Sequence, residues 1–278
     1  MKKIKYILIF LLSLSSLSLS QPIPFPDIII PDYNNIKEFP KQNNINQIPN
    51  EIVLVDGKKY NIDYSWVNAE IYTPENKSST KITNISSEKK YPVLILMHGC
   101  NGINNHVRDW AYFFNSFGYV VILPNSLAIP GRSSWCNVST KTFDESKGQI
   151  AYKIRSTEAA YTMAKLQDFS WVDKKKIFIM GHSEGGVALN FVTDERFKGI
   201  IFSGSPCNVS YYMRNSKIPI LAINWKNDTW IGHLGLCKDN WGEQINATQV
   251  ILEGSGHDTA YSEIAQNSVK DFLKKYSK

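Results

Sequence analysis

The feature of this sequence that most restricts its fold is a serine enclosed by glycines at the end of an apolar run. Lys176–Met180 leads directly into Gly-His-Ser-Glu-Gly-Gly at 181–186, and a segment compatible with a helix follows. A sharp strand-to-helix turn of this kind projects the serine hydroxyl above a sheet, because the glycines lack the Cβ atoms that would clash there. Ser183 is therefore a candidate nucleophile. The alternative, a glycine-rich turn with a surface serine, fits the strand before it and the helix after it less well.

Short apolar runs alternate with longer amphipathic segments through the chain after residue 90. The apolar runs expected to form buried strands are 92–97, 119–124, 176–180, 199–203, 218–223 and 248–252. The segments expected to form helices are 106–117, 147–168, 184–194 and 262–275. This order predicts an α/β protein with a doubly wound, mostly parallel sheet of about eight strands. Glu51–Val55 and Trp66–Tyr72 are expected as antiparallel strands at its N-terminal edge.

The N-terminal part of the chain indicates export. Three lysines precede an apolar run over residues 6–12, and serines dilute that run before it ends. We interpret residues 1–20 as a secretory signal peptide rather than a stable membrane anchor, which would need roughly 18 apolar residues. Residues 21–50, rich in proline and asparagine, show no lasting period and are expected to form an extended arm. Residues 51–278 are then one catalytic domain, and we expect a periplasmic or secreted protein.

Charge and cysteine spacing exclude several classes of function. The formal net charge of +6 is spread along the chain instead of concentrated in one patch, so nucleic-acid binding is not indicated. An even number of cysteines in an oxidising compartment favours disulfides, and spacing alone leaves three pairings open among Cys100, Cys136, Cys207 and Cys237. No two of them form a C-x-x-C pair, so we expect no metal site, and the chemistry needs no cofactor.

A serine nucleophile needs a base, and the base needs an acidic partner. After a nucleophilic turn of this type the acid precedes the histidine in the chain. Asp228 follows the strand at 218–223, and His257 follows the strand at 248–252 in a glycine-rich turn. We predict these two residues as the acid and the base. The weaker candidates in the same stretch are His233 for the base and Asp239, Glu243 and Asp258 for the acid; Asp258 is expected to face solvent or to cap the last helix.

The loop after the first buried strand is expected to help stabilise an oxyanion. It reads His98-Gly-Cys-Asn-Gly102, and its glycines allow the backbone to approach a ligand closely. We predict the backbone N–H groups of Cys100 and Glu184 as the two donors. A competing possibility is that Cys100 is itself the nucleophile, with His98 beside it. It is disfavoured because serine occupies the turn and an exported cysteine tends to oxidise.

Together these motifs resemble the dienelactone hydrolase-like branch of the α/β-hydrolases, over roughly residues 90 to 275. The resemblance rests on 98–102, on Val172-Asp173, on 181–186, and on Asp228 and His257. It implies the α/β-hydrolase fold and a triad of Ser183, Asp228 and His257. Dienelactone hydrolases themselves have cysteine in the turn, so their lactone activity is not implied here. Secreted relatives also imply a Cys207–Cys237 disulfide, which leaves Cys100 to pair with Cys136.

No insertion between the expected strands is long enough for a large cap domain, so the cleft should be open. Loop residues that could line it are Trp135, Trp230 and His233. Aromatic side chains in such loops favour bulky or aromatic acyl groups. We therefore expect a serine hydrolase acting on a small-molecule ester or related acyl compound. The alternatives are a peptidase or amidase using the same triad, and a non-catalytic binding protein on a hydrolase scaffold. The sequence does not indicate an oligomeric state.

Overall fold

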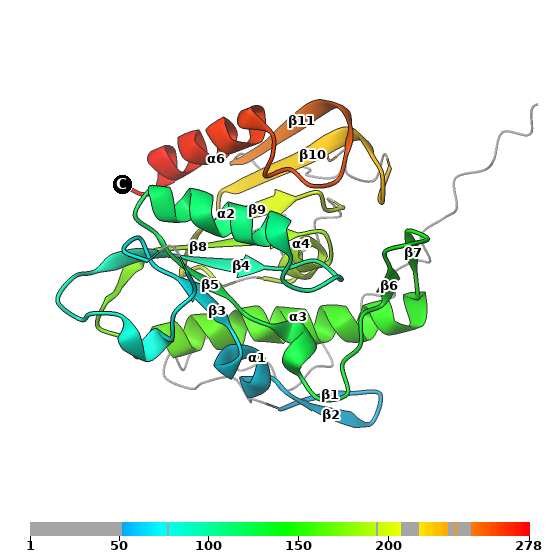
Figure 1. Cartoon of the computed structure of the whole chain (residues 1–278), viewed down its shortest axis with the longest axis horizontal. Coiled ribbons are helices and arrows are strands. Elements are labelled where there is room, and N and C mark those ends of the chain that lie inside the picture. Colours follow the sequence, from blue (N-terminus) through cyan, green and yellow to red (C-terminus); the bar gives the residue numbers. More distant parts are fainter. Residues whose placement is uncertain (1–51, 77, 193, 207–216, 233–236, 238–245) are drawn as a thin grey trace, which may run out of the picture. The chain divides into compact units, whose positions relative to one another are not determined.

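The computed structural model describes residues 52–278, apart from 77, 193, 207–216, 233–236 and 238–245. Its centre is a seven-stranded sheet in the order β11-β10-β9-β8-β4-β5-β3 (Figure 1). All neighbours in this sheet are parallel except β3, which pairs antiparallel with β5 at one edge. The predicted mostly parallel α/β fold is thus confirmed. The predicted leader and arm, residues 1–50, lie outside the described residues.

The main sheet and its helices have the following bounds. Its strands are β3 (Glu70–Tyr72), β4 (Tyr91–Met97), β5 (Val120–Leu123), β8 (Val172–His182), β9 (Phe197–Ser203), β10 (Ile220–Asp228) and β11 (Ala247–Gly256). The longer helices are α2 (Asn105–Ser116), α3 (Glu145–Leu166), α4 (Glu184–Leu189) and α6 (Glu263–Tyr276), and the short ones are α1 (Asp63–Val67), η2 (Ile82–Asn84) and η3 (Ser126–Ala128). None of the helices that the structure describes combines the length and apolar character needed to cross a membrane.

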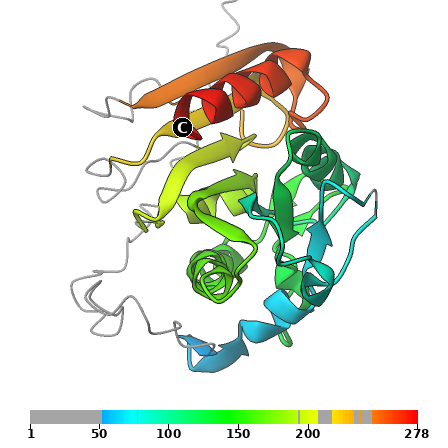
Figure 2. The same ribbon diagram turned by 90° about the vertical axis from the view of Figure 1, so that its left-hand side faces the viewer.

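The side chains of the central strands point alternately to the two faces of the sheet and form a hydrophobic core on each face. In β4, Val93 and Ile95 belong to the core beneath α3, whereas Leu94 and Leu96 belong to the core beneath α2 and α6. Successive side chains of a strand point to opposite faces, so a strand buried on both sides is apolar throughout. Figure 2 shows α2 and α6 on one face of the twisted sheet and α3 on the other. The helices therefore cover both faces of the sheet, so a site is expected at the ends of the strands.

The N-terminal edge differs from the prediction of about eight strands. The segment 51–55 does not join the main sheet, because β1 (Ile52–Val55) pairs with β2 (Lys58–Asn61) in a separate hairpin. Its turn, Asp56-Gly57, has positive φ at both residues, 49° and 74°, as a two-residue hairpin of this hand requires. Trp66 lies in α1, so the edge strand β3 begins only at Glu70. The sheet consequently has seven strands.

A second small hairpin stands beside the carboxyl ends of the strands. Its strands are β6 (Cys136–Asn137) and β7 (Thr142–Phe143), and it lies in the connection from β5 to α3 (Figure 1). The carboxyl ends of parallel strands are where open α/β sheets bind ligands. The hairpin is therefore placed to contribute to a site there.

Candidate active site

Ser183 occupies the turn between β8 and α4. Its φ of 52° and ψ of −118° lie outside the regions that side-chain-bearing residues usually adopt, and such strain is typical of functional positions. A Cβ on Gly181 would lie 2.4 Å from the Gly185 carbonyl carbon, and one on Gly185 would lie 2.3 Å from the Met97 carbonyl oxygen. These glycines are needed because backbone packs directly on backbone around the serine.

Asp228 and His257 meet at the ends of β10 and β11. The His257 Nδ1 lies 2.9 Å from each carboxylate oxygen of Asp228. The buried carboxylate also accepts hydrogen bonds from the backbone N–H groups of Trp230 at 2.8 Å and Ile231 at 3.1 Å. Two backbone donors thus fix the carboxylate, and the carboxylate in turn orients the imidazole.

The end of β9 holds the serine turn and the histidine turn next to each other. The Ser183 N–H donates to the Ser203 carbonyl at 2.9 Å. A Cβ on Gly204 would lie 2.6 Å from the His257 carbonyl oxygen, so the histidine turn packs on this glycine. The ring of His257 stands 4.8 Å from that of His182, the residue before the serine. No hydrogen bond joins the Ser183 hydroxyl to His257 in the described residues; such contacts often tighten only when substrate binds.

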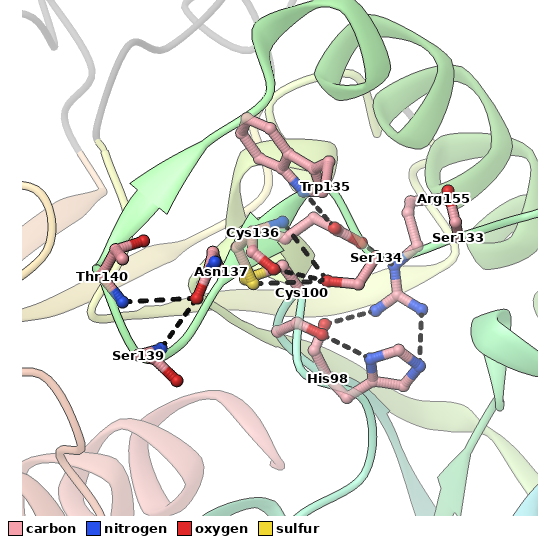
Figure 3. Close-up of a disulfide and its surroundings, with 12 residues drawn as sticks. His98, Cys100, Ser133, Ser134, Trp135, Cys136, Asn137, Ser139, Thr140 and Arg155 are labelled. Atoms are coloured by element: carbon pink, nitrogen blue, oxygen red, sulfur yellow. Dashed lines mark hydrogen bonds and ion pairs between the residues drawn. A yellow bond between two sulfur atoms is a disulfide. The ribbon is translucent and has the colours of Figure 1, made fainter.

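The loop after β4 passes directly beside the serine. A Cβ on Gly99 would lie 3.2 Å from the Ser183 Cβ, which places the following residue, Cys100, at the rim of the turn. Cys100 is buried and forms a disulfide with Cys136 (Figure 3). This is the pairing that the resemblance to secreted relatives implies, and it rules out Cys100 as a free thiol nucleophile. The loop that contains Cys100 and the start of α4 at Glu184 thus both adjoin Ser183.

His98 is a structural residue of the same loop rather than a base. Its Nδ1 contacts the Gly99 carbonyl at 2.7 Å, and its Nε2 accepts the Ser126 N–H at 3.1 Å and contacts an Arg155 Nη1 at 3.3 Å (Figure 3). Complete burial, together with the positive charge of Arg155, holds the pKa of His98 well below its usual range. The ring is therefore neutral, and both nitrogens are engaged in fixing the loop.

A buried charge network surrounds the side chain of Glu184. Its carboxylate accepts hydrogen bonds from the Arg132 guanidinium and the Trp135 indole N–H, and Arg155 Nε lies 3.5 Å away. Arg155 also donates to Glu158 at 2.6 Å and to the His98 carbonyl at 2.7 Å. These two arginines and two glutamates are almost completely buried and compensate one another's charge. The network therefore fixes the residue that follows the nucleophile.

Aromatic rings extend outward from the proposed base. Trp230 stands 5.8 Å from His257 between ring centroids, Phe143 of β7 stands 5.5 Å from Trp230, and Trp135 stands 5.0 Å from Phe143. Trp135 and Trp230, which the sequence predicts as lining residues, thus belong to one series of ring contacts with Phe143 of the hairpin. We refer to Trp135, Phe143 and Trp230 together as the aromatic wall. Trp225 instead supports the histidine turn, because its indole N–H donates to the Asp258 carbonyl at 3.1 Å.

Several sequence predictions have other outcomes. Of the two alternatives expected for Asp258, partial exposure to solvent is found, since its side chain is 45% exposed. It does not cap α6, because the Ser262 hydroxyl accepts the N–H of Ala265 there and is the cap. The residues His233, Cys207, Asp239 and Glu243 lie outside the described residues, so their predicted or alternative roles stay open, as does the Cys207–Cys237 pairing. The predicted helix 184–194 ends at Leu189.

Sequence reasoning missed Phe143 and the charged partners of Glu184. Arg155 and Glu158 are spaced three residues apart on α3, a spacing that places them on one helix face, and this was the available signal. Arg132 and Phe143 lie in the connection from β5 to α3, whose path the sequence does not define.

Comparison with known proteins gives one family and one fold. The model of the dienelactone hydrolase family matches residues 81–271. No curated protein matches the sequence. Among solved structures, Est1E from Butyrivibrio proteoclasticus is 15% identical with a TM-score of 0.54, over 81% of this chain and 98% of its own, and it has also been solved with ferulic acid bound.

Two further solved structures share the fold. A putative dienelactone hydrolase from Klebsiella pneumoniae is 12% identical with a TM-score of 0.53, covering 75% of this chain and 97% of its own. A butyrate-bound thermophilic esterase, Est2, from the Planctomycetes species Thermogutta terrifontis is 13% identical with a TM-score of 0.50. The match covers 82% of this chain and 95% of the esterase.

Proposed function

Because this chain belongs to the dienelactone hydrolase family, we propose that it is an exported serine hydrolase that cleaves carboxylic esters through Ser183, His257 and Asp228. The single observation that carries the proposal is the Asp228–His257 pair, fixed at 2.9 Å beside a strained serine turn. A carboxylate that orients a histidine next to an activated serine supports acyl transfer.

In the proposed mechanism each group has one role. His257 takes the proton of the Ser183 hydroxyl as the oxygen attacks the ester carbonyl, and Asp228 stabilises the resulting imidazolium. The N–H groups of Cys100 and Glu184 donate to the oxyanion of the tetrahedral intermediate. His257 then protonates the leaving alcohol. Water, deprotonated by the same histidine, releases the acid from the acyl-enzyme.

The aromatic wall favours an ester that carries a planar or bulky group. Trp135, Phe143 and Trp230 form a continuous series of ring contacts that ends at His257. Aromatic rings of a substrate gain about 0.5–1.5 kcal/mol from each edge or stacking contact beyond the burial of their area. The binding of ferulic acid by Est1E, a protein of the same fold, agrees with such a preference.

Export is part of the proposal because the leader and the disulfide both favour it. Residues 1–20 have the charge and apolar pattern of a signal peptide. The Cys100–Cys136 bridge would persist in an oxidising compartment and not in a reducing one. Mass spectrometry of the protein recovered from culture medium or periplasm should give an N-terminus near Gln21. An intact Met1 in that fraction would contradict cleavage.

The activity is tested with p-nitrophenyl esters of short-chain and aromatic acids. We expect hydrolysis by the wild type and a loss of at least about 10⁴-fold in kcat for Ser183→Ala, which removes only the nucleophilic oxygen. A Ser205→Ala variant is the matched control, since Ser205 is a buried serine two residues after β9 and is assigned no step. Equal activity in the wild type and Ser183→Ala would overturn the assignment of the nucleophile.

A further inference from the structure

Three side chains that the proposed mechanism does not use gather behind the proposed triad. They are His106 of α2, His182 at the end of β8, and Asp258 in the turn after β11. Their nearest ligand atoms all lie within 4.8 Å of one another. We propose that these three residues form a binding site for a divalent transition-metal ion, Zn²⁺ in the first instance.

The first observation is that His106 is buried without a hydrogen-bond partner. The residue is 2% exposed, and in the described part of the chain neither ring nitrogen has a partner. Leaving a buried polar group unpaired is destabilising, because the group gives up its hydrogen bonds to water and gains none in the protein. The His106 Nδ1 faces an Asp258 carboxylate oxygen at 4.0 Å, too far for a hydrogen bond. An ion between the two groups would satisfy both.

The second observation is that His182 is held as metal-ligating histidines usually are. Its Nδ1 contacts the Ser203 hydroxyl at 3.1 Å, and that hydroxyl is hydrogen-bonded to the Thr259 hydroxyl at 2.7 Å. The other ring nitrogen, Nε2, faces the same Asp258 oxygen at 3.6 Å. A polar group on one imidazole nitrogen typically fixes the orientation of the ring while the other nitrogen binds the metal.

The donor set and its dimensions suit zinc. Two imidazoles and one carboxylate occur together in zinc sites that keep the fourth position open. Metal–ligand bonds of about 2.0–2.2 Å place tetrahedral ligand atoms about 3.3–3.5 Å apart. The two pairs that include the Asp258 oxygen lie at 3.6 Å and 4.0 Å, and all three ligand atoms lie within 4.8 Å of one another, so a small inward movement would bring them to these distances. The Asp258 side chain is 45% exposed, so it can move inward and solvent can reach the open position. Calcium and magnesium, which prefer oxygen ligands, are disfavoured.

Sequence spacing gave no indication of this site. Metal sites are recognised in a sequence when their ligands are close together, as in C-x-x-C pairs, and the expectation of no metal rested on the cysteines. His106, His182 and Asp258 come from three elements that only the fold brings together. The inference concerns binding alone and does not depend on esterase activity.

The test is calorimetric titration of the metal-stripped full chain with ZnSO₄. We expect one equivalent bound by the wild type, and a dissociation constant raised at least about tenfold in Asp258→Asn and in His106→Asn. Asp258→Asn keeps the size of a half-exposed side chain, so this variant is expected to fold even where His106→Asn is destabilised. His257→Asn is the matched control, because that histidine lies beside the cluster but outside it; its affinity should stay within about threefold.

Three results would overturn the proposal. The first is the absence of saturable binding by the wild type. The second is unchanged affinity in the folded Asp258→Asn variant, which would indicate ions bound elsewhere on the surface. The third is a loss of binding in His257→Asn with none in Asp258→Asn, which would place the ion on the proposed triad. Visible absorption of bound Co²⁺ should in addition report a tetrahedral site in the wild type and not in Asp258→Asn.

Discussion

Glu184 connects the proposed chemistry to the stability of the site. Its backbone N–H is one proposed oxyanion donor, and its carboxylate is completely buried between Arg132 and Arg155. The side chain therefore fixes the backbone that has to point at the reacting oxygen. Removing one member of a buried ionic network is costly because the remaining charges are left uncompensated.

Substitution Glu184→Gln should destabilise the protein and impair catalysis together. The variant keeps the volume but leaves two buried arginines with one glutamate, so we expect the free energy of unfolding to fall by about 3–5 kcal/mol. Trp135→Phe, which removes one hydrogen bond to the same carboxylate, should cost about 1–3 kcal/mol. Urea denaturation measures both. A Glu184→Gln variant as stable as the wild type would show that the network does not need this charge.

The connection from β5 to α3 supplies residues to several parts of the proposed site. It supplies Arg132 and Trp135 to the Glu184 carboxylate, Cys136 to the disulfide with Cys100, and Phe143 to the aromatic wall. Both residues proposed to donate to the oxyanion are thus tied to one loop, by a covalent bond on one side and by hydrogen bonds on the other. Figure 3 shows the disulfide between Cys100 and Cys136, with Trp135 beside it.

Removal of the disulfide should therefore reduce both stability and turnover. For cysteines 36 residues apart, loop-closure entropy gives a loss of about 4 kcal/mol in the free energy of unfolding. In Cys100→Ala/Cys136→Ala we also expect kcat to fall more than KM rises, because the proposed role of the Cys100 N–H is to stabilise the transition state rather than the bound substrate. Ester kinetics and urea denaturation test the two effects. An unchanged kcat in the double variant would refute the claim that the bridge positions this donor.

The elements that sequence could predict are those whose pattern is local. The buried strands and the Ser183 turn follow from apolar runs and glycine spacing, and Asp228 and His257 follow from chain order. The β6–β7 hairpin and Arg132 could not be predicted, because their positions depend on contacts with Glu184 and Cys100 that lie far away in the sequence. The Asp56-Gly57 dipeptide is a local signal for a hairpin. It explains why residues 52–55 pair with β2 in a separate hairpin and not with the main sheet.

At the scale of the whole molecule, folding buries histidines around one end of the sheet. His98, His106 and His182 are almost completely buried. Burial is the largest cause that lowers the pKa of each, and for His106 it lowers the pKa to about 3. The unfolded chain therefore binds protons that the folded chain does not bind below about pH 6.5, the ordinary pKa of histidine. Each of these histidines makes the protein less stable as the pH falls through that value.

This effect can be isolated with a His106→Leu variant studied in the presence of a chelator. Because the pKa of His106 is lowered, the free energy of unfolding of the wild type should fall by about 2 kcal/mol between about pH 6.5 and pH 5. The variant has no imidazole at this position, so its free energy of unfolding lacks this contribution. The stability difference between the two proteins should therefore shift by that amount in favour of the variant when the pH is lowered from about 7.5 to 5. Urea denaturation at the two pH values measures it. A difference independent of pH would contradict the neutral, buried state of His106.

Covalent labelling can identify the nucleophile, which we propose to be Ser183. The purified full chain would be treated with a fluorophosphonate, and the adduct located by peptide mass spectrometry. We expect one adduct per chain on Ser183, much slower labelling in Asp228→Asn, and none in Ser183→Ala. An adduct on another residue, or a folded wild type that stays unlabelled, would contradict it.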